Sequence, residues 1–119
     1  MTRAQIAWLE VETIGEVTVG RFARCRILSD EAVQQAGEQL LDLAESAGRK
    51  KVLLDLGGVE GMTTTFLAKL VELHNQLSAS GGRLALCRVS PSLREIFTIC
   101  HFPRLAPLYS GEQEAIDSF

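Results

Sequence analysis

The chain has 119 residues and a formal net charge of −3, the balance of 12 basic and 15 acidic side chains. This length fits one domain, and a hydrophobic share of 46% is too high for a disordered protein. Because no basic excess is available to neutralise phosphates, the composition disfavours direct binding to nucleic acid.

The first two predicted elements are strands that form a hairpin. Residues 8–13 alternate, with Leu9, Val11 and Thr13 on one face, and residues 16–23 alternate again around an interrupting glycine. A two-residue segment containing glycine separates them and is typical of a tight turn.

A helix and a buried strand are predicted next. Ser29 and Asp30 offer an N-cap, and Gly48 offers a stop after a series of apolar residues at helical spacing. Residues 51–56 (KVLLDL) are almost continuously apolar, which is typical of a strand covered on both faces. The glycine-rich segment 57–61 is predicted to be a loop.

The remaining elements alternate between helix and strand. A second helix begins at residues 63–65, a buried strand covers 83–89, and a third helix starts at Ser90-Pro91, where a cap precedes a proline. A short strand at 108–109 and a last helix capped by Ser110 complete the series.

This order predicts a single α/β domain over residues 1–119. Its central sheet is mixed, with the opening hairpin joined to parallel strands, and about four α-helices cover it. No internal repeat or linker divides the chain.

The cysteines and the short apolar runs indicate in which cellular compartment the protein works. Cys25, Cys87 and Cys100 have no CxxC spacing and are typical of buried thiols under reducing conditions. No apolar run approaches the ~18 residues of a membrane-spanning helix. Residues 1–5 lack the apolar segment of a signal peptide, so we expect a cytoplasmic protein that does not bind membranes.

The sequence contains few residues suited to catalysis. His74 and His101 are the only histidines, and neither has the spacing of a metal-ligand set. Motifs for nucleophilic catalysis and phosphate cradles are missing. We therefore expect no enzymatic activity, no metal and no cofactor. Asp55, at the end of a buried strand, keeps open a ligand-binding or enzymatic alternative.

The most informative segment is the row of three threonines at 63–65. One threonine at a helix start is explained as an N-cap that accepts the free N–H groups of the first turn. Capping does not account for three adjacent threonines. The other hydroxyls are candidates for modification, since a phosphate would add a charge of about −1.5 to −2 at an exposed helix end.

Two longer segments carry a family resemblance. Residues 51–77 read KVLLDLGGVEGMTTTFLAKLVELHNQL, and residues 81–97 read GGRLALCRVSPSLREIF. Their order and spacing resemble the STAS domain family, in which a strand, a short loop and a D-S-S/T-G-L motif precede an amphipathic helix. Soluble members of that family include bacterial anti-sigma factor antagonists.

The resemblance implies a regulatory protein that works by partner switching. In the family, the first serine of the motif is phosphorylated by a partner that is both an anti-sigma factor and a serine/threonine kinase. Thr64 matches that serine, Thr65 matches the next hydroxyl residue as the alternative phosphoacceptor, and Thr63 and Phe66 replace the aspartate and the glycine. The unmodified protein would bind the anti-sigma factor and free the sigma factor, and phosphorylation would release the antagonist.

The expected partner-binding face surrounds the start of the second helix and comprises Glu60, Met62, Thr63, Thr64, Thr65 and Phe66. Met62 and Phe66 are either exposed apolar anchors or core residues. The alternative function is an unphosphorylated STAS interaction module in a signalling assembly. The oligomeric state stays open.

Overall fold

The predicted α/β architecture, with a mixed sheet and four helices, is confirmed by the computed structural model, which describes residues 8–45, 51–99 and 107–119. The elements that it describes are β1 (Leu9–Ile14), β2 (Val17–Phe22), β3 (Cys25–Ile27), α1 (Asp30–Glu45), β4 (Lys51–Asp55), β5 (Val59–Met62), α2 (Thr64–Ala79), β6 (Arg83–Cys87), α3 (Pro91–Ile99), β7 (Leu108–Tyr109) and α4 (Glu112–Ser118).

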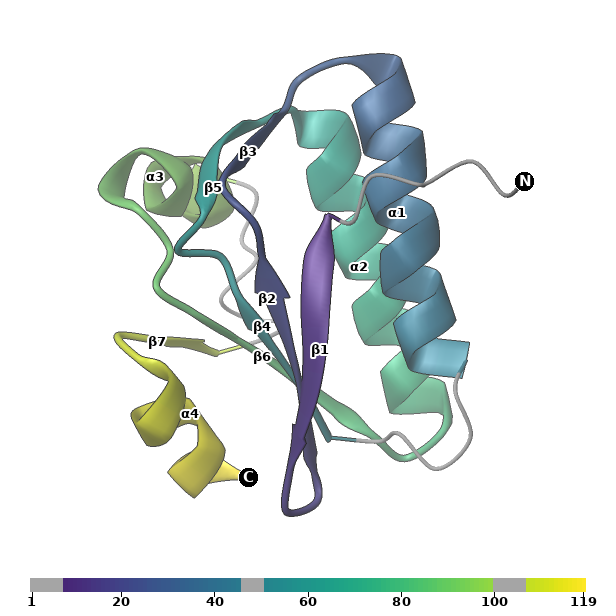
Figure 1. The fold of residues 1–119 in the computed structure, drawn as a ribbon, viewed down its shortest axis with the longest axis vertical. Helices are drawn as coiled ribbons and strands as arrows, with labels where there is room; N and C mark the ends of the chain where they lie inside the picture. Colours follow the sequence, from purple (N-terminus) through teal and green to yellow (C-terminus); the bar gives the residue numbers. More distant parts are fainter. Residues whose placement is uncertain (1–7, 46–50, 100–106) are drawn as a thin grey trace, which may run out of the picture.

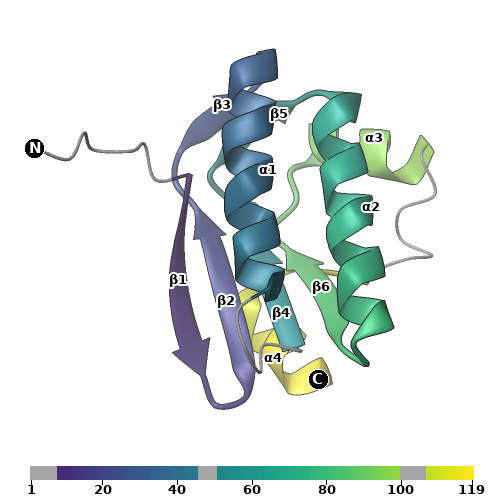
Figure 2. The same cartoon turned by 90° about the vertical axis from the view of Figure 1, so that its right-hand side faces the viewer.

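A five-stranded sheet of order β1-β2-β4-β6-β7 forms the centre. β1 and β2 are the predicted antiparallel hairpin, and the pairs β2–β4, β4–β6 and β6–β7 are parallel. Figure 1 and Figure 2 show α1 and α2 over one face of the sheet and α4 over the other. Buried side chains accordingly form two clusters, a large one that includes residues of α1 and α2 and a small one that includes α4.

A second, two-stranded parallel sheet of β3 and β5 was not expected. The loop predicted at 57–61 is wrong in its second half, because Val59–Met62 is a strand. This strand has four residues, among them an acidic residue and a glycine, so no strand pattern is visible in the sequence. Gly58 brings the two segments together: its carbonyl accepts the Cys25 N–H at 2.9 Å, and a Cβ there would lie 2.4 Å from the Phe22 carbonyl oxygen.

Most predicted helix ends are confirmed. Ser29 caps α1 and Ser90 caps α3, with side-chain oxygens that accept first-turn N–H groups at 3.0 and 3.3 Å. The cap at Ser110 is wrong, because Gly111 is the N-cap of α4 and makes no side-chain capping bond. The stop predicted at Gly48 lies outside the described residues.

Candidate functional site

The start of α2 separates the three threonines into two roles. Thr63 is the N-cap: its backbone is extended, and its Oγ1 accepts the Phe66 N–H at 3.3 Å. Thr64 and Thr65 are exposed, and in the described part of the chain their hydroxyls have no hydrogen-bond partner. Capping therefore explains one threonine, and two free hydroxyls remain at the helix end.

The small sheet holds this helix start in place. The Thr63 N–H donates to the Ile27 carbonyl at 3.1 Å, directly after the register pair of Ile27 and Met62. Since Ile27 lies three residues before α1, this bond places the starts of α1 and α2 beside each other. Figure 2 shows both helices beginning at the end of the molecule that carries β3 and β5.

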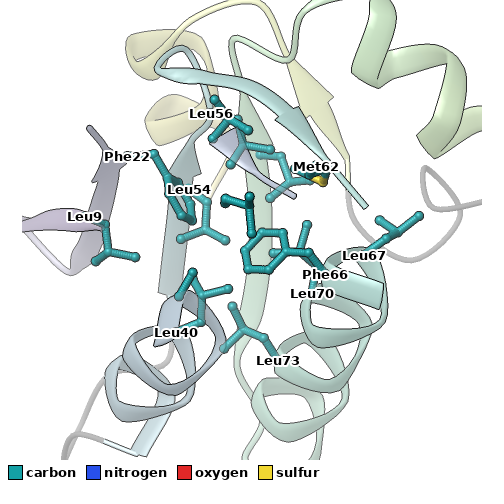
Figure 3. Close-up of a cluster of buried hydrophobic side chains, with 14 of the residues drawn as sticks. Leu9, Phe22, Leu40, Leu54, Leu56, Met62, Phe66, Leu67, Leu70 and Leu73 are labelled. Atoms are coloured by element: carbon teal, nitrogen blue, oxygen red, sulfur yellow. The ribbon is translucent and has the colours of Figure 1, made fainter. Parts of the chain in front are cut away.

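Met62 and Phe66 belong to the core, so their interpretation as exposed apolar anchors is wrong. Met62 is 6% exposed and Phe66 is fully buried. Figure 3 shows both side chains directed into the large cluster, and the Phe66 ring packs edge-on against Phe22 with 6.1 Å between ring centroids. Phe66 lies with Leu70 and Leu73 on the buried side of α2. The Phe66 ring therefore takes no part in the solvent-exposed surface at the start of α2.

Glu60 is exposed but already paired within the chain. Its carboxylate lies 2.7 Å from the Arg24 Nε and 3.6 Å from the Arg26 Nε. The hydrogen bond and charge of Arg24 lower the pKa of Glu60, with a smaller contribution from Arg26. A partner that contacts Glu60 would also meet these two arginines, which the sequence reading did not include.

Leu28 is an exposed apolar side chain near this surface that the sequence reading missed. It is 55% exposed, and its Cδ2 would lie 3.6 Å from a Cβ built at Gly61. Leu28 directly follows the last residue of β3 and precedes the cap residue Ser29. Because β3 was not visible in the sequence, no local pattern separated the exposed Leu28 from the fully buried Ile27.

Asp55 lies in a separate polar network at the carboxyl end of β4. Its Oδ1 accepts the Gly57 N–H at 2.8 Å and the Arg88 Nε–H at 2.9 Å. Arg21 binds Glu112 of α4 through two nitrogens, at 2.7 and 2.8 Å, and also pairs with Glu12. The network therefore links α4 to the main sheet.

The charges of this network affect one another. Burial raises the pKa of Asp55, and the neighbouring Glu112 carboxylate raises it further, while Gly57 and Arg88 act in the opposite direction. Hydrogen bonds from Arg21 and then Asp55 lower the pKa of Glu112 to about 2. Arg21, Asp55 and Arg88 border a cleft of about 260 Å³. Their charged groups are hydrogen-bonded within the network, as buried polar groups in a structural role usually are.

Cys25 and Cys87 are both free thiols. Burial raises the pKa of Cys87 to about 12, and burial followed by Glu60 raises that of half-buried Cys25, so both thiols stay protonated at neutral pH. Cys100 and His101 lie outside the described residues. Over the described ranges, no three His, Cys, Asp or Glu residues are grouped to hold a metal ion, and no helix is long and apolar enough to cross a membrane.

Comparison with known proteins gives the family. The model of the STAS domain family matches residues 9–115. The chain belongs to the STAS domain family. A relative of this STAS protein is BtrV of Bordetella bronchiseptica, described by its name as a proposed anti-sigma factor antagonist; the two are 31% identical over 72 residues, which span 60% of this chain and 62% of BtrV.

Solved structures agree with this family. The anti-sigma-factor antagonist (STAS) domain protein of Planctomyces limnophilus is 32% identical, with a TM-score of 0.81 over 92% of this chain and 96% of that chain. SpoIIAA of Bacillus in its phosphorylated form is 21% identical, with a TM-score of 0.70 over 92% of this chain and 97% of that chain. At 21% identity, the similarity to SpoIIAA shows that the two proteins share a fold.

Proposed function

We propose that this STAS protein is an anti-sigma factor antagonist that binds an anti-sigma factor with serine/threonine kinase activity and is released from it when Thr64 is phosphorylated. Its relatives include proteins named as anti-sigma factor antagonists, and one structure of the same fold is of a phosphorylated protein. In this proposal the protein works in a bacterial cytoplasm, acts on transcription through its partner, and has no catalytic activity of its own.

The observation that carries the proposal is the exposed, unbonded hydroxyl of Thr64 beside the cap residue Thr63. Because Thr63 satisfies the helix end, Thr64 is free for another purpose. Because the Phe66 ring is buried, it does not obstruct a kinase that approaches the helix start. The proposed contact surface comprises Leu28, Glu60, Thr64 and Thr65.

The switch follows from charge. The kinase transfers the γ-phosphoryl group of ATP to the Thr64 Oγ1, and ADP leaves with the proton passing to solvent. The new group brings about two negative charges into the centre of the contact surface. Burying them against a partner costs desolvation, so the complex dissociates.

The test is an affinity capture from the native cell with the wild-type protein and with Thr64→Glu. We expect the wild type to retain an ATP-binding anti-sigma factor, and Thr64→Glu to retain at least about tenfold less, a difference of about 1.4 kcal/mol. Incubation of the captured partner with ATP should add one phosphate to Thr64, which mass spectrometry locates. Thr13→Ala, at an exposed threonine of β1, is the matched control for Thr64→Ala.

The outcomes separate the alternatives. Phosphate at Thr65 would assign the switch to the neighbouring hydroxyl. Equal capture by wild type and Thr64→Glu, with no phosphate added, would contradict the proposal and favour the unphosphorylated interaction module. Leu28→Ala should weaken capture without changing phosphate transfer to the protein at saturating concentration, because Leu28 contributes only contact area.

A further inference from the structure

A cleft of about 410 Å³ lies between α1 and α2. Figure 2 shows the two helices side by side over one face of the central sheet. The half-buried Leu41 of α1 contributes apolar surface to the cleft, with the buried Val33 behind it. Asp30 and Glu38 contribute carboxylates, and Thr65 lines the cleft from α2. Since Thr65 directly follows Thr64, the cleft is continuous with the proposed contact surface.

Acidic residues dominate the α1 side of this cleft. α1 contains five acidic residues and no basic one, whereas the whole chain has a net charge of −3, so the rest of the chain carries a net +2. Asp30 and Glu38 are both exposed. Within the described ranges, Glu38 accepts a single hydrogen bond, from the amide of Gln34 at 3.4 Å. The cleft therefore combines negative charge with apolar surface.

Lys69 is the one basic residue among the described residues that line the cleft, and it forms no ion pair with Asp30 or Glu38. Its alkyl chain lies against α1 at Gly37, where a Cβ would be 3.2 Å from the Lys69 Cγ and Cδ. Its ammonium group lies 4.0 Å from Glu72 of its own helix. Gly37 thus allows the lysine stem to pack between the helices, while the acidic groups stay open to an outside partner.

We propose that this cleft binds a basic amphipathic helix of the protein partner, as a contact separate from the Thr64 switch. The proposal rests on the proposed function, because it concerns the same partner. Asp30 and Glu38 are eight residues apart, which is about 12 Å along a helix. A docked helix with lysine or arginine residues about two turns apart, and a leucine-like residue between them, matches both the charges and the half-buried Leu41.

The test uses the full chain, labelled with ¹⁵N, and a synthetic amphipathic peptide of leucine, alanine and lysine with lysines at positions i, i+4 and i+8. We expect the largest amide shifts in the stretches that line the cleft, around Gln34, Glu38, Thr65 and Lys69. Glu38→Gln should weaken peptide binding about threefold, the scale of one exposed charge pair. Higher salt should weaken it further.

Two controls make the result specific. Glu114→Gln, an exposed acidic residue of α4, should leave peptide binding unchanged, and a peptide with glutamate in place of lysine should not bind. Shifts scattered over the surface, equal effects of the Glu38 and Glu114 substitutions, or binding of the acidic peptide would each overturn the assignment.

The cleft and the switch can fail separately. Thr64→Glu should change peptide affinity less than twofold, because Thr64 does not line the cleft. Loss of peptide binding with intact phosphorylation of Thr64 would overturn the cleft alone. Specific peptide binding in a chain that captures no kinase would uphold the cleft as a site for basic helices and contradict the proposed function.

Discussion

At the scale of single residues, three adjacent threonines have distinct physical tasks. The hydroxyl of Thr63 bonds to the helix backbone, whereas those of Thr64 and Thr65 face solvent. The family motif has an aspartate at the position of Thr63, and both residue types are good N-caps. The substitution therefore preserves the helix start and removes one negative charge from the surface next to Thr64.

This division of tasks predicts how alanine affects stability at each position. Thr63→Ala should lower the free energy of unfolding by about 1 kcal/mol, because a first-turn N–H loses its acceptor. Thr64→Ala and Thr65→Ala should change it by less than about 0.5 kcal/mol. Urea unfolding followed by circular dichroism measures all three, and Thr63→Asp should restore the wild-type value. An equal loss at Thr63 and Thr64 would contradict the cap assignment.

At the scale of elements, α4 is a short helix held by a charge network as well as by apolar contacts. Its seven residues bury Ala115, and Arg21 of β2 forms two bonds with Glu112 in its first turn. Because Arg21 lowers the pKa of Glu112 to about 2, the folded state binds that proton more weakly than the unfolded chain does. The pair therefore contributes stability above the ordinary pKa of a glutamate and loses it as the pH falls toward 2.

The expected measurement compares wild type with Glu112→Gln by urea unfolding at neutral pH and near pH 3. The substitution should destabilise the protein by about 1 kcal/mol at neutral pH, as the loss of a partly exposed ion pair. The difference should shrink as the pH falls from about 4.5. Asp55 acts in the opposite sense, since its raised pKa favours the protonated folded state at low pH and this contribution fades as the pH rises. Glu114→Gln is the control, and a difference independent of pH would contradict the role of Glu112.

Periodicity and end signals predict most elements, because each long helix and buried strand carries its pattern within its own residues. The pair β3–β5 has three and four residues, and it exists because of pairing between distant segments that no local pattern encodes. The same reason applies to the site. The exposed hydroxyls at Thr64 and Thr65 could be predicted, but the burial of Phe66 and the cleft at Glu38 depend on how α1 and α2 pack together.

At the scale of the whole molecule, the two faces of the sheet differ in how much buried apolar surface supports them. Residues of α1, α2 and α3 belong to the large cluster, whereas the small cluster beneath α4 consists of Val17, Val19, Leu53, Ala85, Cys87 and Ala115. Charge is also uneven, since α1 alone exceeds the net negative charge of the chain. The face that carries α1 and α2 therefore has the larger buried apolar cluster, and α1 is the most acidic of the described helices.

Amide hydrogen exchange should show that the two faces of the sheet differ in local stability. Amides of α4 should exchange through local opening at least about tenfold faster than those in the centre of α2, because a short helix over a small cluster opens without disturbing the main core. Exchange of the intact protein, followed residue by residue with NMR, provides the comparison. Identical opening free energies for α4 and α2 would show that both belong to one cooperative unit.

The parallel pair β3–β5 has a consequence for the kinetics of recognition. The Thr63 N–H is bonded to the Ile27 carbonyl, so the backbone next to Thr64 is ordered before any partner arrives. A partner then loses little of its binding energy to ordering this segment, and association can proceed without a slow folding step. The speed of encounter then depends on collision and orientation rather than on rearrangement of the chain. Such a surface would suit the exchange of partners that we propose.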